Sequence, residues 1–285
     1  GYKKDGPPVL YMGTSDAYVV ASPARDLRSG EWRHVAVVRR GSTLHMYVDG
    51  TKIAELEQDG GPAARDTPDF DWWAQALASR GYAVLQPNFR GSGGFGEKFT
   101  VAGNGQWGKA MQDDVTDALK HMIATGVTDP KRVCIVGASY GGYAALAGAT
   151  LTPDLYKCAV SISGVSDLVE MLKAERHDNG TDSNGFYYWR YSIGDPDKDR
   201  AALEAVSPVK LANNVTVPVL LIHGDADETV PVRQSVIMND ALRSAGKQVK
   251  LIRLPKADHY WDDWERKDRL TLYQETAAFL KQHLN

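Results

Sequence analysis

The chain has 285 residues, of which 43% are hydrophobic and 24% are charged, a composition typical of a soluble globular protein. Its net charge is −3 at pH 7 and its lysines and arginines are scattered, so we expect neither nucleic acid nor a membrane surface as a partner. No apolar run approaches the roughly 18 residues of a membrane span, and no basic-then-apolar signal pattern opens the sequence, which favours the cytoplasm.

Residues 1–58 have the alternating pattern of antiparallel β-structure. Apolar and polar residues alternate on both sides of the Asp49-Gly50 pair, which is a strong hairpin signal. The stretch over about 10–57 resembles a fragment of the laminin-G and concanavalin A-like lectin sandwiches. Because such a sandwich needs more strands than this stretch holds, we expect residues 1–58 to dock as a lectin-like fragment on the rest of the chain. Exchange of this fragment between two copies would give a homodimer.

Residues 59–285 alternate strand and helix patterns. Continuous apolar runs suited to buried strands recur between amphipathic stretches with helical spacing. This order predicts an α/β fold, with a mostly parallel sheet and helices on both of its faces. Strands are expected at 82–86, 133–136, 158–162, 218–222 and 249–254, and helices at 69–80, 107–125, 233–244, 270–284 and directly after residue 139. Between residues 171 and 196 the sequence is polar and aromatic and shows no clear period.

The two cysteines, Cys134 and Cys158, both lie in apolar runs that are predicted to be buried strands. Buried free thiols are common in such positions, so we expect core packing here rather than a disulfide. The cysteine count therefore constrains the redox compartment only weakly.

A short motif connects the strand at 133–136 to an alanine-rich helix. Residues 137–141 read Gly-Ala-Ser-Tyr-Gly, which fits the GxSxG pattern in its required strand–turn–helix setting. Such a turn strains the backbone at the serine and exposes its hydroxyl at the edge of the sheet, so Ser139 is a candidate nucleophile. The alternative is a glycine-rich turn without a catalytic role.

A serine nucleophile needs a histidine to accept its proton and a carboxylate to orient that histidine. His259 follows the last predicted strand, where the base is expected. The carboxylates of Asp225, Asp227 and Glu228 follow the preceding strand and compete for the role of the acid. A metal site at this cluster is disfavoured because no pair of liganding histidines accompanies it, so we expect no metal and no cofactor. His223, which ends the same strand, is interpreted as a structural hydrogen-bond donor.

Several further motifs lie in the second part of the chain, at 60–62, 88–96, 137–142, 207–209, 223–231 and around His259. With them, residues 60–285 resemble the catalytic domain of the prolyl oligopeptidase family, closest to its acylaminoacyl-peptidase and dipeptidyl-peptidase branch. The resemblance implies an α/β-hydrolase fold whose catalytic triad is Ser139, Asp227 and His259. It also implies an oxyanion hole formed by backbone N–H groups of Tyr140 and of the Gly60-Gly61 turn.

Two features depart from the family pattern. Asp59 stands where the family has a histidine before Gly-Gly-Pro, and the family's first sheet strands and its β-propeller have no counterpart in the sequence. The hairpins at 31–57 are the β-material without an assigned place. We therefore expect them to cover the open sheet edge, with 51–58 leading into the Gly60-Gly61 turn.

These features together predict a serine hydrolase that forms an acyl-enzyme. Short-chain esters are the favoured substrates, as for a carboxylesterase, because their leaving groups demand less of an altered oxyanion hole. An aminopeptidase or acylaminoacyl peptidase is the alternative among enzymes, and a carbohydrate-binding protein with an inactive hydrolase scaffold is the alternative from another class. Phe186, Tyr188 and Trp189 either line an apolar acyl pocket or belong to a helix packed on the core.

Overall fold

The computed structural model describes residues 17–21, 35–40, 43–48, 51–57, 64–66, 71–260 and 264–284. Its strands are β1 (Ala17–Ala21), β2 (Val35–Arg40), β3 (Thr43–Val48), β4 (Thr51–Glu57), β5 (Ala83–Leu85), β6 (Val133–Ala138), β7 (Cys158–Ile162), β8 (Val219–Gly224) and β9 (Val249–Leu254). Its α-helices are α1 (Trp72–Ala78), α2 (Glu97–Val101), α3 (Ala110–Ala124), α4 (Tyr140–Leu151), α5 (Leu168–Asn179), α6 (Asn184–Ile193), α7 (Arg200–Glu204), α8 (Arg233–Ser244) and α9 (Arg266–Leu284). Among the helices so described, none is long and apolar enough to cross a membrane.

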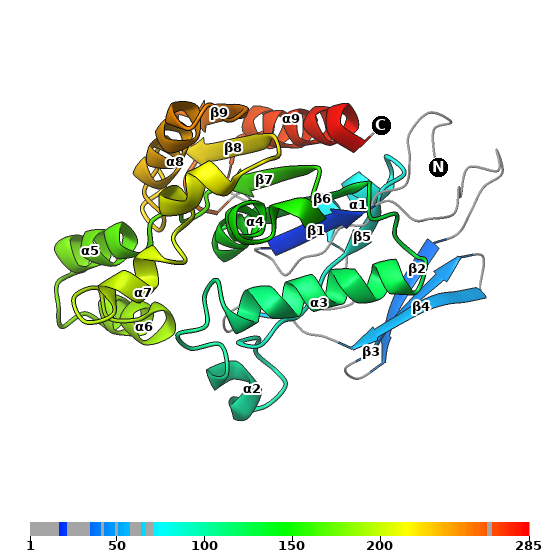
Figure 1. Ribbon diagram of the computed structural model, residues 1–285, viewed down its shortest axis with the longest axis horizontal. Coiled ribbons are helices and arrows are strands. Elements are labelled where there is room, and N and C mark those ends of the chain that lie inside the picture. Colours follow the sequence, from blue (N-terminus) through cyan, green and yellow to red (C-terminus); the bar gives the residue numbers. More distant parts are fainter. Residues whose placement is uncertain are drawn as a thin grey trace.

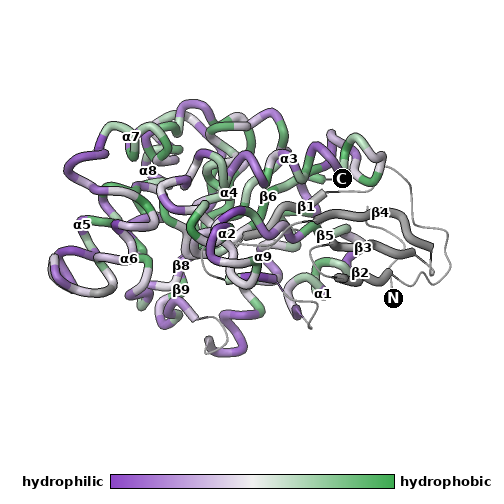
Figure 2. The backbone as a smooth tube through the Cα atoms, turned by 90° about the horizontal axis from the view of Figure 1, so that it is seen from below, coloured by the Kyte–Doolittle hydropathy of each residue, from purple (hydrophilic) through white to green (hydrophobic). Residues whose placement is uncertain are grey.

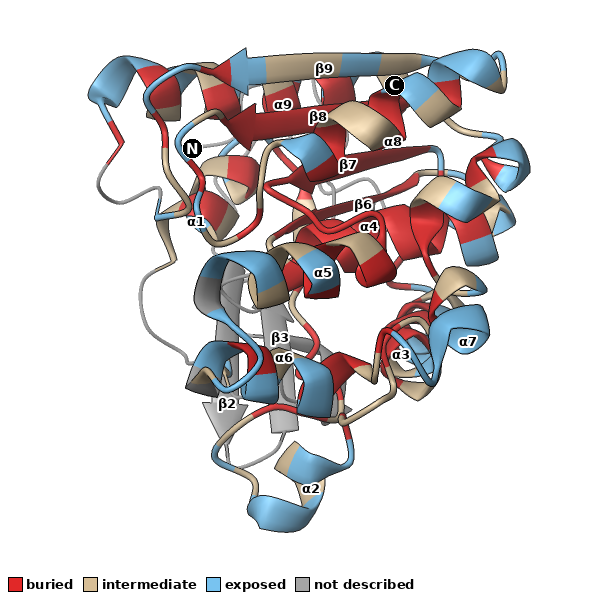
Figure 3. Ribbon diagram, turned by 90° about the vertical axis from the view of Figure 1, so that its left-hand side faces the viewer, coloured by how far each residue is buried: buried red, intermediate tan, exposed pale blue. Residues whose placement is uncertain are grey.

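The larger sheet has six strands in the order β5-β1-β6-β7-β8-β9. Strands β6 to β9 pair in parallel, each with the next (Figure 1). β6, β7 and β8 are buried along their whole length, because both faces of the sheet are covered, whereas the edge strand β9 is more exposed (Figure 3). The predicted architecture, a mostly parallel sheet with helices on both faces, is confirmed.

Alternate residues of the buried strands point to opposite faces of this sheet and build two separate cores. On one face, Ile135 and Leu221 pack with residues of α3, α4 and α8. On the other, Val136 and Ile222 pack with residues of α1 and α9. Figure 2 shows the hydrophobic stretches, in green, along the central strands and the hydrophilic ones, in purple, at the outer loops. With both faces covered, the carboxyl edge of the parallel strands is the place where loop side chains can meet.

A strand from the N-terminal segment lies inside the six-stranded sheet. β1 runs antiparallel between β5 and β6, with Val19 opposite Leu85 and Ala17 opposite Gly137 (Figure 1). The strand that lies beside β6 is thus β1. The expectation that the hairpins at 31–57 are the β-material that covers the open edge of the hydrolase sheet is therefore wrong. A five-residue strand whose partners lie far along the chain leaves no local pattern from which that pairing can be predicted.

Strands β2, β3 and β4 form a separate three-stranded antiparallel sheet. Val48 of β3 pairs with Thr51 of β4, as the predicted hairpin requires, and the Asp49-Gly50 turn itself lies outside the described residues. The described part of β4 thus pairs with β3 and not with a strand of the larger sheet. Docking of residues 1–58 on the hydrolase sheet as one lectin-like unit stays a prediction.

The polar and aromatic segment that follows β7 is helical rather than irregular. The side chain of Asp167 caps α5 by accepting the N–H of Glu170, and Ser183 caps α6 by accepting the N–H of Phe186. Each of these two helices ends at a glycine with a positive φ. The capping signals are thus present in the sequence, but the buried residues of α5 are confined to 168–172 and much of α6 is exposed, so neither helix has a strong apolar period to reveal it.

Cys134 and Cys158 form a disulfide, which corrects the expectation of free thiols. Both cysteines are fully buried, as predicted, but they are also direct register partners on the neighbouring parallel strands β6 and β7. The register of two strands is set by the whole sheet and cannot be predicted from either strand alone. The disulfide joins the strand that carries the nucleophile turn to its neighbour.

The Cys134→Ala, Cys158→Ala double variant is expected to lower the free energy of unfolding by about 3 kcal/mol, since the bond closes a loop of 24 residues. Urea titration of the variant and the parent chain measures this difference. A reductant present during unfolding should shift the midpoint of the parent chain and leave that of the variant unchanged. A parent midpoint that ignores the reductant would show that the thiols are not linked.

Candidate active site

Ser139 lies in the turn between β6 and α4, at the carboxyl edge of the sheet. Its backbone has φ 55° and ψ −121°, a conformation that residues other than glycine rarely adopt. The surrounding glycines permit the turn. A Cβ on Gly137 would lie 2.8 Å from the Cα of Gly141, and one on Gly142 would lie 2.6 Å from the Cα of Gly164. The strained strand–turn–helix motif expected from the sequence is therefore present.

Three side chains from different loops form one hydrogen-bonded chain at this edge. Ser139 Oγ lies 2.9 Å from His259 Nε2, and His259 Nδ1 lies 2.8 Å from Asp227 Oδ2. Because an ionised carboxylate can only accept, Nδ1 carries the proton and Nε2 accepts from the serine hydroxyl. In this arrangement a histidine can take the serine proton while the serine oxygen attacks a carbonyl carbon.

The Asp227 side chain is fully buried, and hydrogen bonds stabilise its ionised carboxylate. Oδ1 accepts the backbone N–H of Thr229 at 3.0 Å and that of Val230 at 2.8 Å. Burial by itself would raise the pKa of this carboxyl group. The hydrogen bonds from His223 and His259 outweigh burial and hold the pKa of Asp227 well below its usual range. The carboxyl group of Asp227 is thus ionised at neutral pH.

The structure separates the three carboxylates that compete for the role of the acid. Asp225 Oδ1 accepts from Nε of Arg253 at 2.6 Å. Glu228 is exposed. Of the three, Asp227 is the one that reaches His259, in agreement with the residue that the family resemblance implies.

The loop that carries Asp227 is tied directly to the loop that carries His259. The backbone N–H of Ala226 donates to the carbonyl of Ala257 at 3.0 Å. Gly224 permits this contact, because a Cβ at that position would lie 2.6 Å from the Ala257 carbonyl carbon. The distance between the side chains of Asp227 and His259 therefore depends on Gly224.

The substitution Gly224→Ala is expected to lower kcat by about tenfold to hundredfold, because the new methyl group pushes the His259 loop away from Asp227. Steady-state kinetics and the thermal midpoint measure the two consequences. Gly246→Ala is the matched control: its positive φ makes an alanine unfavourable there, but nothing lies within 4 Å of the new Cβ. It should lower the midpoint and leave kcat unchanged. Equal losses of kcat in both variants would contradict the explanation.

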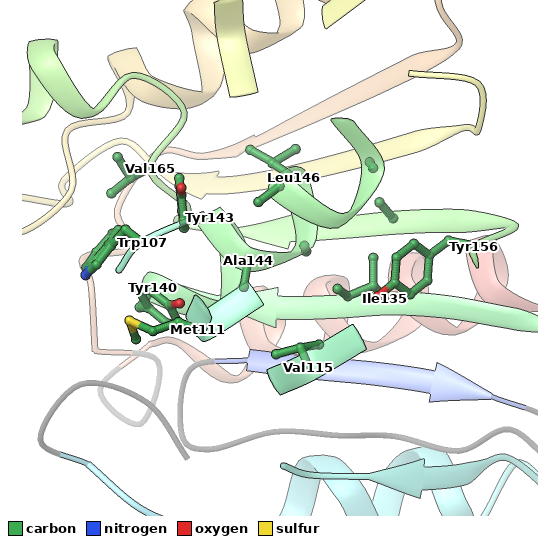
Figure 4. Close-up of a cluster of buried hydrophobic side chains, with 14 of the residues drawn as sticks. Trp107, Met111, Val115, Ile135, Tyr140, Tyr143, Ala144, Leu146, Tyr156 and Val165 are labelled. Carbon is green, nitrogen blue, oxygen red and sulfur yellow. The ribbon is translucent and has the colours of Figure 1, made fainter. Parts of the chain in front are cut away.

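A cluster of aromatic rings lies next to the nucleophile (Figure 4). The ring centroid of Tyr140, the residue after Ser139, lies 4.5 Å from that of Trp107 and 5.2 Å from that of Phe89. Trp107 in turn lies 6.1 Å from Trp189. Burial raises the pKa of the Tyr140 hydroxyl well above its ordinary value, so this group stays neutral. No recognised motif singles out Trp107, so its place in this cluster is not predicted from the sequence.

The predicted oxyanion donors are described only in part. Tyr140 is the first residue of α4, where backbone N–H groups have no acceptor within the helix and the helix dipole favours negative charge. Gly60 and Gly61 lie outside the described residues. The oxyanion hole as a whole therefore stays a prediction.

The three residues predicted to line an acyl pocket all lie on α6 but have different surroundings. Phe186 is buried, Tyr188 is exposed, and Trp189 is half-buried against Trp107. The burial of Phe186 fits the alternative, a helix packed on the core. Trp189 is the member that the ring contacts connect, through Trp107, to Tyr140 beside the nucleophile. The acyl pocket stays a prediction.

Comparison with known families identifies this arrangement. Residues 68–285 match the prolyl oligopeptidase family. The chain belongs to this family. Residues 2–92 match the concanavalin A-like lectin/glucanases superfamily, so the two matches overlap over residues 68–92. Both resemblances expected from the sequence are thereby confirmed.

Two curated relatives of this family member are peptidases by name. Dipeptidyl aminopeptidase BIII of Pseudoxanthomonas mexicana is 39% identical over 252 residues, which cover 80% of this chain and 35% of the relative. Dipeptidyl peptidase family member 6 of Caenorhabditis elegans is 36% identical over 201 residues, which cover 70% of this chain and 27% of the relative. The chain thus spans about a third or less of the length of these relatives. Their names favour the peptidase alternative and do not support the expected carboxylesterase specificity.

Solved structures of the family share the fold. An acylaminoacyl peptidase in complex with Z-Gly-Gly-Phe-chloromethyl ketone superposes with a TM-score of 0.73 at 23% identity, covering 99% of this chain and 51% of that one. A Mycobacterium tuberculosis puromycin-hydrolyzing peptidase gives 0.73 at 24% identity, covering 98% and 40%. These likenesses establish the α/β-hydrolase fold.

Proposed function

We propose that this chain is a serine peptidase that hydrolyses amide bonds in short peptides or acylated amino acids. The observation that carries the proposal is the hydrogen-bonded chain of Ser139, His259 and Asp227, with the serine in a strained turn. Relatives named as dipeptidyl peptidases and acylamino-acid-releasing enzymes support an amide rather than a simple ester as the substrate.

In the proposed mechanism Ser139 Oγ attacks the carbonyl carbon of the substrate while its proton passes to His259 Nε2, 2.9 Å away. The imidazolium so formed is stabilised by the ionised Asp227. His259 then gives the proton to the leaving amine, and the C–N bond breaks to leave an acyl-enzyme on Ser139. Water, deprotonated by the same histidine, hydrolyses this ester and releases the serine.

The negative charge of the tetrahedral intermediate needs donors at the N-terminus of α4. The backbone N–H of Tyr140 supplies one, and its position in the first turn of the helix adds the favourable end of the helix dipole. The second donor of the proposal is the Gly60-Gly61 turn. An amide substrate depends more strongly on this pair than an ester does, because its leaving group is poorer.

Trp189 is half-buried and supplies apolar surface near the nucleophile, with its ring centroid 6.1 Å from that of the buried Trp107, which lies 4.5 Å from Tyr140. This surface supports a substrate with a hydrophobic side chain close to the scissile bond. An acidic side chain at that position would lose its hydration without gaining a partner from the ring.

Turnover of aminoacyl and dipeptidyl nitroanilides, compared with short-chain nitrophenyl esters on one preparation, tests the proposal. We expect measurable nitroanilide turnover and stoichiometric fluorophosphonate labelling, both lost in Ser139→Ala. Ester turnover without nitroanilide turnover would reject the peptidase in favour of an esterase. Absence of labelling, with retention on a glycan column, would reject the enzyme in favour of a carbohydrate-binding protein.

A further inference from the structure

His223 is a fully buried histidine that the proposed mechanism does not use. It lies at the carboxyl end of β8, four residues before Asp227. Its Nδ1 lies 2.7 Å from Ser235 Oγ, its Nε2 lies 2.8 Å from the carbonyl oxygen of Val230, and the same Nε2 lies 3.4 Å from Asp227 Oδ2. Both ring nitrogens therefore have partners.

These partners determine which nitrogen carries the proton. A backbone carbonyl can only accept a hydrogen bond, so Nε2 of His223 must be the donor. In the neutral form of the ring Nδ1 is then the acceptor, and the hydroxyl of Ser235 donates to it. These partners, from α8 and from the loop between β8 and α8, fix one tautomer of that form and one orientation of the ring.

The ring holds the turn that carries the acid. The backbone of Val230 is held on both sides of its Cα, since its N–H donates to Asp227 Oδ1 at 2.8 Å and its carbonyl accepts from His223. The Nε2–H of His223 also faces Oδ2 of Asp227, the oxygen that accepts from His259. The side chains of Ser139, His259, Asp227, His223 and Ser235 thereby form a series with the carboxylate at its centre and one serine–histidine pair on each side.

We propose that His223 is a positioning residue of the triad, which holds the turn from Asp227 to Val230 so that Asp227 Oδ2 faces His259 Nδ1. The inference rests on the proposed function, because it assigns His223 a part in the same proton transfer. His223 does not reach the substrate, and its effect passes entirely through Asp227. If the turn from Asp227 to Val230 were loose, the carboxylate would no longer hold the imidazole of His259 in one orientation. Proton transfer from Ser139 would then slow.

Three variants test the proposal. His223→Leu removes both hydrogen bonds of the ring, whereas His223→Gln returns an amide N–H near the position of Nε2. His121→Leu, on an exposed residue of α3, is the matched control. We expect His223→Leu to lower kcat by about tenfold to hundredfold with KM unchanged, His223→Gln to recover most of the loss, and His121→Leu to behave as the parent chain.

A spectroscopic measurement separates positioning from packing. The low-field proton resonance of the His259 Nδ1–H···Asp227 hydrogen bond should shift or broaden in His223→Leu and return in His223→Gln. Where His223→Leu does not fold, Ser235→Ala replaces it. Loss of the Ser235 hydroxyl removes the hydrogen bond to Nδ1 of His223 and keeps the histidine ring in the core. That variant should also lower kcat and perturb the resonance.

Two results would overturn the proposal: parent-like kcat in His223→Leu or its replacement Ser235→Ala, or equal losses of kcat in the leucine and glutamine variants with the resonance unmoved. Failure of the proposed function is seen separately, as nitroanilide turnover that survives in Ser139→Ala. The resonance does not depend on turnover, so it still decides the role of His223 in that event.

Discussion

Alanine at Ser139 or at His259 is expected to lower kcat by about 10⁴-fold or more, because each substitution removes the proton transfer on which the nucleophile depends. The hydrogen bond of 2.9 Å between the two side chains is the structural basis of this expectation. Single-turnover and steady-state rates with a dipeptidyl nitroanilide measure it. The double variant should lose little more than either single variant, since the two residues act as one unit.

Asp227→Ala should be somewhat milder than the other two, because the serine and the histidine that accepts its proton are both still present, although the carboxylate no longer orients the histidine. Asp225→Ala is the matched control, since that side chain pairs with Arg253 instead of His259. It should cost far less. A loss of kcat in Asp225→Ala as large as that in Asp227→Ala would overturn the assignment of the acid.

Proline at Val19 is expected to make the chain largely insoluble or to lower its free energy of unfolding by about 3 kcal/mol. β1 pairs with β5 on one side and with β6 on the other, so a proline in it removes a ladder donor inside the sheet. Opening this strand would also expose the edge of β6, which is buried along its whole length. Soluble yield, size-exclusion profile and urea titration measure the outcome.

Val37→Pro is the matched control, because it places the same substitution in β2 of the separate three-stranded sheet. We expect it to leave the unfolding of the hydrolase part and its activity close to those of the parent chain. If the two variants behave alike, β1 does not support the hydrolase sheet in the way its pairing indicates. Deletion of residues 1–50 should agree with Val19→Pro.

The sequence predicts the second half of the fold well, and the reason is local. The strands β7 and β9 and the helix α8 have the predicted bounds, because each is an apolar or amphipathic run between clear breaks. The helix α5 was missed because its buried residues lie only in its first turns and its second half is polar. The helix α6 was predicted only as an alternative to an acyl pocket, since three of its aromatic residues are exposed and weaken the apolar period. The strand β1 and the disulfide were missed because both depend on strand register, which no single segment contains.

In the candidate site, too, local patterns predict some residues and only the three-dimensional structure identifies the others. Ser139 and His259 follow from a motif and from their positions after strands, whereas the residues alone leave Asp225, Asp227 and Glu228 open as the acid. Three-dimensional placement separates them, because Asp225 pairs with Arg253 and Asp227 turns inward. The place of Trp107 likewise depends on rings brought together from α4, α6 and two loops.

The side chains of the hydrogen-bonded triad come from the turns and loops that follow β6, β8 and β9, three of the four parallel strands. The other half of the sheet, with β1 and β5, contributes none of the atoms in that chain. Exchange of the segment before residue 133 would therefore change residues around the substrate and leave Ser139, His259 and Asp227 unchanged. In a chain that joins a lectin-like segment to a hydrolase, such an exchange would alter the substrate contacts and the proposed Gly60-Gly61 donor, while the atoms that move the proton stay in place.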